Sequence, residues 1–107
     1  YLRCSYNKIT NLFIPEGLEI LYCSSIKLSI LPELPQSLIY LCCHNNQLLS
    51  LPELPQGLKK LYCCNNKLSK LPNLSQGLHI LYYSNNPLQY DFEPTIDNIR
   101  AYQATNL

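Results

Sequence analysis

The apolar positions of this chain recur with a spacing that neither a regular helix nor a regular strand explains alone. In the stretch 51–70 they stand at Leu58, Leu61, Cys63 and Leu68. The step from 58 to 61 is one tight turn, and the step from 61 to 63 is the alternation of a short strand. The pattern therefore predicts a short strand around Leu61 and Cys63 that is flanked by turns.

This pattern repeats with a period of 20 residues, because 31–50 and 71–90 match 51–70 at about half of their positions without a gap. One unit cannot cover its own leucines. Stacked units place equivalent residues about 4.7–4.9 Å apart and bury them in continuous columns. The sequence therefore predicts a β-rich solenoid with a parallel sheet along one face.

The whole chain, 1–107, is predicted to form a single domain. It is divided into a partial repeat 1–11, repeats 12–30, 31–50, 51–70 and 71–90, and a degenerate terminal repeat 91–107.

The unit reads L-x-x-L-x-C-x-x-N-x-L and resembles the leucine-rich repeat, with Cys in place of the third Leu. Its Leu-Pro-x-Leu-Pro opening and short length resemble the repeats of secreted bacterial effectors and of giant DNA viruses. The sheet is then expected on the concave face. Paired prolines disfavour a helix on the convex side, so we expect extended or 3-10 segments there, no long α-helix and weak curvature. Pro32 and Pro35 also satisfy P-x-x-P, but their recurrence in phase with the leucines favours a structural role.

A polar column accompanies the leucines. Asn7, Asn46, Asn66 and Asn86 occupy equivalent places, and Ile26 interrupts them. A chain that turns out of a strand inside a stack leaves backbone groups without partners, which an Asn amide can satisfy. We therefore predict a ladder of buried amides that bonds adjacent units.

The two ends depart from the full unit. Residues 1–11 match only its second half, so Leu2 and Ile9 would be uncovered, and we expect preceding residues or an edge or end-to-end contact with another chain. The given sequence is thus expected to be a segment of a longer chain. In 91–107, Ile99, Ala101 and Ala104 take the Leu, Cys and Asn places, which predicts a charged terminal unit that shields the stack.

The outward residues of the predicted strands form an aromatic, weakly charged face. Tyr and Arg are enriched at protein interfaces, and the resemblance to leucine-rich repeats implies protein binding by this face. The predicted partner-binding residues are Tyr22, Tyr40, Tyr62, Tyr82, Arg3, Arg100 and His44. The alternative is a structural spacer or assembly component, for instance of a virion or surface complex, in which the stacked rings only stabilise the sheet.

Composition narrows the classes of partner. The chain is 47% hydrophobic and has a formal charge of +1. It therefore lacks the excess of basic residues that is typical of a nucleic-acid-binding protein. It has no apolar run long enough to span a membrane. The partner is therefore expected to be a protein.

The cysteines follow the period of the strands. Cys4, Cys23, Cys43 and Cys63 occupy one inward column, whereas Cys42 and Cys64 are predicted to face outward in different columns, poorly placed for a disulfide. This spacing favours a reducing compartment, such as a cytosol or a virion.

Catalysis and metal binding are not expected. Cys64 and His44 fall in one outward column and could form a nucleophile pair. An open sheet face, however, offers no third group to orient the base and no oxyanion donors. Ligands for a metal do not converge, because Cys63 points inward. We therefore expect no metal, no cofactor and no enzymatic activity.

Overall fold

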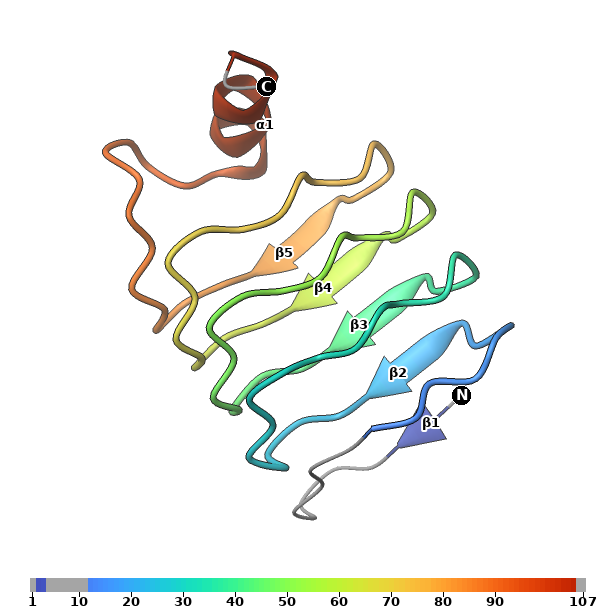
Figure 1. Cartoon of the computed structure of the whole chain (residues 1–107). Coiled ribbons are helices and arrows are strands. Elements are labelled where there is room, and N and C mark those ends of the chain that lie inside the picture. Colours follow the sequence, from blue (N-terminus) through green and yellow to red (C-terminus); the bar gives the residue numbers. More distant parts are fainter. Residues whose placement is uncertain (1, 4–11, 106–107) are drawn as a thin grey trace.

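The protein has a β-rich, repeat-like fold in which each coil of the chain contributes one short strand to a parallel sheet (Figure 1). The computed structural model describes residues 2–3 and 12–105. The sheet has five strands in the order β1-β2-β3-β4-β5, and one short helix, α1, follows them. The elements are β1 (Leu2–Arg3), β2 (Ile20–Tyr22), β3 (Tyr40–Cys42), β4 (Lys60–Tyr62), β5 (Ile80–Tyr82) and α1 (Ile96–Thr105).

The register of the strands is the one that the spacing of the leucines predicts. Leu21 pairs with Leu41, Leu41 with Leu61, and Leu61 with Leu81. Leu2 of β1 pairs with Leu21 of β2. The prediction that each strand leucine lies beside its counterpart one coil away is therefore confirmed.

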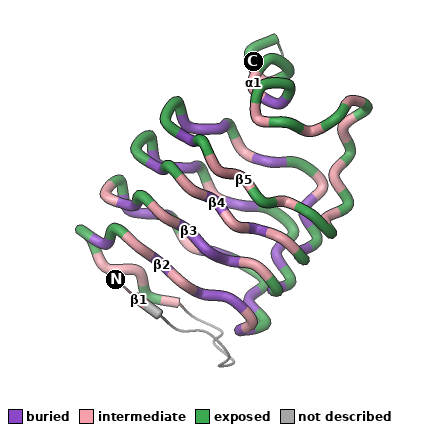
Figure 2. Tube along the Cα trace, turned by 180° about the vertical axis from the view of Figure 1, so that it is seen from behind, coloured by how far each residue is buried: buried purple, intermediate pink, exposed green. Residues whose placement is uncertain are grey.

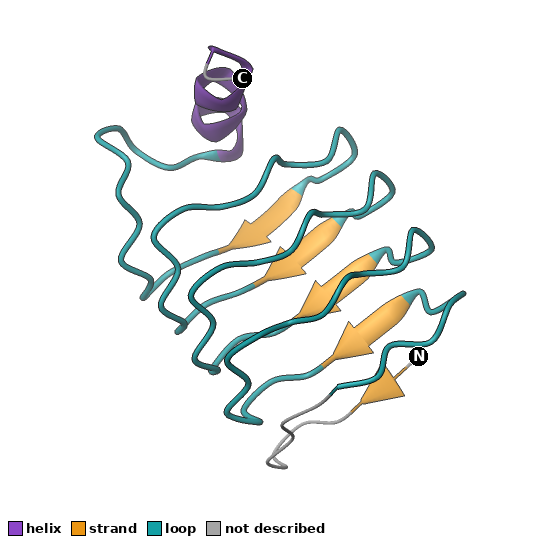
Figure 3. Cartoon of the chain, viewed as in Figure 1, coloured by secondary structure: helices purple, strands orange, loops and turns teal. Residues whose placement is uncertain are grey.

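Return segments, residues 31–38, 51–58 and 71–78, run back opposite the strands and close each coil (Figure 3). They contain no helix and no strand, as the prolines predict. Leu51, Leu54, Pro55 and Leu58 are nevertheless buried, because their side chains complete the apolar columns begun by the strands. Figure 2 shows buried residues recurring at similar places in successive coils.

An Asn-Asn pair follows each of the last three strands, and its two residues have different roles. Asn45, Asn65 and Asn85 have φ of 58°, 58° and 59°, the left-handed conformation that Asn tolerates better than most residues. The second Asn of each pair turns inward and bonds to the backbone. The amide ladder, defined as the side chains of Asn46, Asn66 and Asn86, is confirmed, whereas Asn7 lies outside the described residues.

Each ladder amide links two coils. The Asn66 Nδ2 donates to the carbonyls of Cys43 and Cys63, both at 3.1 Å, and its Oδ1 accepts from the N–H of Leu48 at 3.1 Å. The Asn46 Oδ1 accepts from the N–H groups of Ile26 and Leu28. The coil that carries Ile26 in place of Asn therefore still has a hydrogen-bonded turn, because the Asn46 side chain of the following coil accepts from it.

The prediction of a terminal repeat with Ile99 in a strand position is wrong, because residues 96–105 form α1. Thr95 caps this helix, its Oγ1 accepting from the N–H of Asn98 at 3.1 Å, and Pro94 precedes the cap. Ile99 is fully buried against the last coil. The expectation that this region covers the end of the stack holds, but a helix does the covering, and Figure 1 shows it beyond β5.

Side chains of the C-terminal segment replace the bonds that a further coil would make to the last return segment. The Arg100 Nη2 donates to the carbonyls of Ser75, Gln76 and Leu78 at 2.6, 3.1 and 2.8 Å. The Gln103 Oε1 accepts from the N–H of Leu74 at 3.0 Å, and its Nε2 donates to the carbonyl of Pro72 at 2.9 Å. The end of the stack is thus sealed by charge-assisted and amide hydrogen bonds in addition to apolar contact.

Candidate protein-binding face

Four tyrosine rings lie in one continuous row across the exposed face of the sheet. We call Tyr22, Tyr40, Tyr62 and Tyr82 the tyrosine strip. Ring centroids are 5.4 Å apart for Tyr22 and Tyr40, 5.3 Å for Tyr40 and Tyr62, and 4.9 Å for Tyr62 and Tyr82. The last two pairs are stacked, with interplanar angles of 30° and 19°. The row spans strands β2 to β5, so it is a surface that no single coil could provide.

Tyr40 enters this row from a different strand position than the other three. Tyr22, Tyr62 and Tyr82 are register partners along the middle of the sheet face, where β3 carries Cys42 instead. Cys42 is small, and the Tyr40 ring fills the space between the rings of Tyr22 and Tyr62. Tyr40 was predicted to be one of the partner-binding tyrosines together with the other three, and its ring joins those of Tyr22 and Tyr62.

The strip is graded in exposure from its interior to its end. Tyr22, Tyr40 and Tyr62 are partly buried by one another, whereas Tyr82 is 54% exposed on the outermost strand. Burial raises the pKa of Tyr40 well above its ordinary value, and hydrogen bonding with Tyr62 and Tyr22 adds to the effect. Its hydroxyl therefore stays protonated at a pH at which an ordinary tyrosine ionises. The Lys60 Nζ lies 5.8 Å from the centre of the Tyr40 ring, within the range of a cation–π contact.

His44 lies against Cys42 of its own coil. The His44 Nδ1 is 3.1 Å from the Cys42 Sγ and 3.2 Å from the Ser24 Oγ, and the Ser24 Oγ is 3.4 Å from the same sulfur. Cys42 was predicted to face outward, yet it is only 6% exposed because Tyr40 and this cluster cover it. Cys64 instead accepts a hydrogen bond from the Ser84 hydroxyl at 3.4 Å.

The two arginines of the predicted face are placed differently. Arg3 lies in β1 and is the register partner of Tyr22, which puts its backbone in line with the strip. Arg100 lies in α1, and its guanidinium bonds to the carbonyls at the end of the stack. The prediction that Arg100 belongs to the sheet face is therefore wrong.

Buried thiols form the inner column behind the strip. Cys23, Cys43 and Cys63 are fully buried, as predicted, and Cys4 lies outside the described residues. Burial raises the pKa of Cys43 well above its usual range and that of Cys63 to about 12, with the nearby Cys64 adding to the latter. The five cysteines in the described part are free thiols. Tyr83 continues the column, half-buried, whereas Ala101 lies in α1, contrary to its predicted place.

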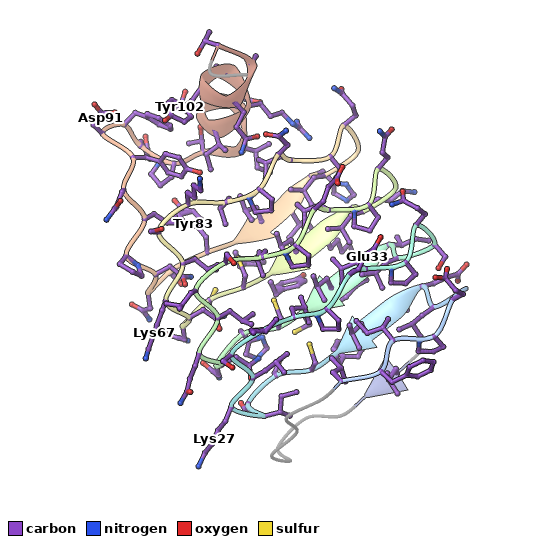
Figure 4. The ribbon with its side chains drawn as sticks, viewed as in Figure 1. Lys27, Glu33, Lys67, Tyr83, Asp91 and Tyr102 are labelled. Carbon is purple, nitrogen blue, oxygen red and sulfur yellow. The ribbon has the colours of Figure 1, made fainter. Side chains whose placement is uncertain are left out.

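A hollow lies on the side opposite the strip, between the last return segment and α1. It has a volume of about 620 Å³, and its walls include Lys70, Pro72, Asn73, Tyr90, Tyr102 and Gln103. The Tyr90 and Tyr102 rings meet edge to face at 5.7 Å. Figure 4 shows Tyr102 and Asp91 at this end of the molecule. The repeat pattern does not predict this hollow, because it exists only where the helix replaces a coil.

Within residues 2–3 and 12–105, no three His, Cys, Asp or Glu side chains are grouped so that they could hold a metal ion. The same residues include no helix with the length and apolar character needed to cross a bilayer. No protein-family model matches this chain, and no curated protein and no solved structure matches it either.

Proposed function

We propose that this chain is a leucine-rich repeat solenoid, weakly curved with its sheet on the concave side, that binds a partner protein through the tyrosine strip. The motif and period support the class of repeat, and the observed register agrees with them. The single observation that carries the binding function is the continuous row of four rings on an open sheet face.

The chemistry of the strip suits a protein ligand. Each ring offers a large apolar area whose rotamer is already restricted by its neighbour, so little conformational entropy is lost on binding. The hydroxyls can bond to a partner's backbone or side chains. Tyr82, the most exposed ring, is where a contact would remove the most surface from water.

The stacking itself favours a second candidate, a structural part with no ligand on this face. Rings on neighbouring strands stabilise a sheet by about 0.2–1 kcal/mol per pair, and three of the four are already partly covered. In that case the face would be a consequence of stability alone.

Selection from a random peptide library displayed on phage separates the two candidates without knowledge of the natural partner. The whole chain is the target, and enriched peptides are retested on Tyr62→Ala/Tyr82→Ala and on Tyr90→Ala/Tyr102→Ala. The second variant removes two tyrosines that lie off the face. Circular dichroism verifies that each variant is folded.

The binding function predicts enriched peptides that lose affinity for the first variant by about tenfold or more, as loss of hot-spot rings would cause, and keep it for the second. No enrichment, or peptides that depend on Tyr90 and Tyr102 instead, would contradict the proposal. The structural candidate predicts that Tyr62→Ala/Tyr82→Ala changes only the free energy of unfolding.

A further inference from the structure

The middle of the chain carries lysines and few carboxylates. From Leu54 to Tyr90 the sequence contains four lysines and neither Asp nor Glu. Glu33 and Glu53 belong to the return segments, opposite the strands. Lys67 lies at the turn edge and Lys70 lines the hollow beside α1, so the positive charge of the β3 to β5 part of the sheet comes from Lys60 and the adjacent Lys59, and this part lacks carboxylates.

One of these lysines contacts the tyrosine strip, and a second precedes it in the sequence. Lys60 is the first residue of β4, with its ammonium over the Tyr40 ring. Lys59 precedes the strand and is exposed. Neither lysine forms an ion pair with any residue in the described part of the chain. Glu19 occupies the position equivalent to Lys59 two coils earlier. At this position the next three coils carry Ile39, Lys59 and His79, none of which is a carboxylate.

The tyrosine hydroxyls have the same preference as the lysines. Tyr40 is held as a neutral phenol, because burial and its hydroxyl neighbours disfavour the phenolate. A neutral phenol and an ammonium can both donate a hydrogen bond to a carboxylate, whereas neither gains from a cationic ligand. The rings supply the apolar area, and the lysines determine which sign of charge is attracted.

We propose that the occupant of this face is an acidic segment of a partner protein, one that carries Asp or Glu beside an aromatic or apolar residue. The aromatic residue packs on the exposed end of the strip at Tyr62 and Tyr82, and the carboxylates pair with Lys59 and Lys60. This inference rests on the proposed binding function and assigns a chemical class to its ligand.

Random copolymers of glutamate and tyrosine, and of lysine and tyrosine, are suitable probes, because they differ only in the sign of their charge. Fluorescence anisotropy measures the binding of each labelled copolymer to the whole chain at low and at physiological salt. The test variant is Lys59→Glu/Lys60→Glu. Its matched control is Lys27→Glu/Lys67→Glu, which makes the same change in net charge at residues that project from the turn edge of the stack (Figure 4).

The acidic copolymer should bind the wild type, more weakly as salt rises, and the basic one should not. Lys59→Glu/Lys60→Glu should weaken the acidic copolymer by about tenfold or more, and the control by about twofold or less, because only the former charges touch the ligand. Equal binding of both copolymers, equal effects of the two variants, or no binding of the acidic copolymer would each overturn the inference.

The outcome for ligand charge is independent of the outcome for the binding function. If library peptides depend on Tyr62 and Tyr82 but are not enriched in Asp and Glu, the face binds proteins and the acidic class is wrong. If the acidic copolymer binds but Tyr62→Ala/Tyr82→Ala does not weaken it, the copolymer does not bind at the strip and the acidic class is wrong, whereas the library peptides still decide the binding function.

Discussion

Substitution of the ladder asparagines tests how the coils are held together, and the structure ranks the substitutions. Asn46→Ala removes the acceptor of two buried N–H groups, those of Ile26 and Leu28. Asn66→Ala removes the acceptor of one, that of Leu48. The carbonyls of Cys43 and Cys63, which Asn66 also serves, retain a bond from the ladder amide of an adjacent coil or of their own coil.

The magnitudes follow from counting the groups that lose every partner. An unsatisfied buried N–H costs about 1–3 kcal/mol, and a lost second bond to a carbonyl costs about 0.5–1.5 kcal/mol. Asn66→Ala orphans one N–H group and removes one bond from each of two carbonyls, so it should lower the free energy of unfolding by about 2–6 kcal/mol. Asn46→Ala should lower it by about 1–3 kcal/mol more than Asn66→Ala does, since it orphans one further N–H group.

Urea unfolding followed by far-ultraviolet circular dichroism measures these differences. Asn65→Ala and Asn65→Gly are the controls, because Asn65 is exposed and serves the turn only through its positive φ. Asn65→Ala should cost about 1 kcal/mol for the left-handed backbone and Asn65→Gly almost nothing. Equal losses for Asn46→Ala and Asn66→Ala, or losses no larger than those of the controls, would refute the reasoning.

Three further predictions concern the cap, the strip and the buried thiols. Arg100→Ala should cost about 2–3 kcal/mol in urea unfolding, since three carbonyls lose a charged donor, and a change within about 0.5 kcal/mol would speak against the cap. Tyr40→Ala should cost about 1–3 kcal/mol through two lost ring contacts, and an unchanged midpoint would disprove the packed row. Because burial raises the pKa of Cys63 to about 12, its thiol favours the folded state up to the ordinary thiol pKa of about 8.5, and this contribution declines as pH rises toward 12. Unfolding of Cys63→Ala should therefore depend less steeply on pH above about 9 than that of Cys64→Ala, and identical slopes would contradict it.

Much of the sheet could be predicted because its determinants repeat. Leu21, Leu41 and Leu61 stand at one position of the unit, so the register follows from the period alone. The second Asn of each pair was predicted to bond inward for the same reason. The distinct role of the first, exemplified by Asn65, was missed, although Asn before a turn is a known signal for a positive φ.

Contacts made by residues that depart from the repeat could not be predicted by comparing equivalent positions of the units. In β3 the ring belongs to Tyr40 and the small side chain to Cys42, whereas the neighbouring strands carry a ring at the position of Cys42. The Tyr40 ring therefore fills the gap that the small Cys42 side chain leaves. Cys42 and His44 are two residues apart and thus on one side of the strand, a spacing that could have predicted their contact.

The helix was missed for a different physical reason. Ile96 and Ile99 are three residues apart, and this spacing fits one turn of the repeat as well as one turn of a helix. The signal that could have separated the two is the Pro94-Thr95 pair, typical of a helix start, followed by Ala101 and Ala104. The cap formed by Arg100 is a consequence of that helix and could not be predicted without it.

The central claim is that the tyrosine strip is the surface that a partner contacts, and nuclear magnetic resonance of ring-labelled tyrosines tests it most directly. On titration with a library-selected peptide, the account predicts shifts or broadening of the Tyr22, Tyr40, Tyr62 and Tyr82 signals, largest at Tyr82, with Tyr90 and Tyr102 unchanged. Changes confined to Tyr90 and Tyr102, with the four strip signals unmoved, would contradict it.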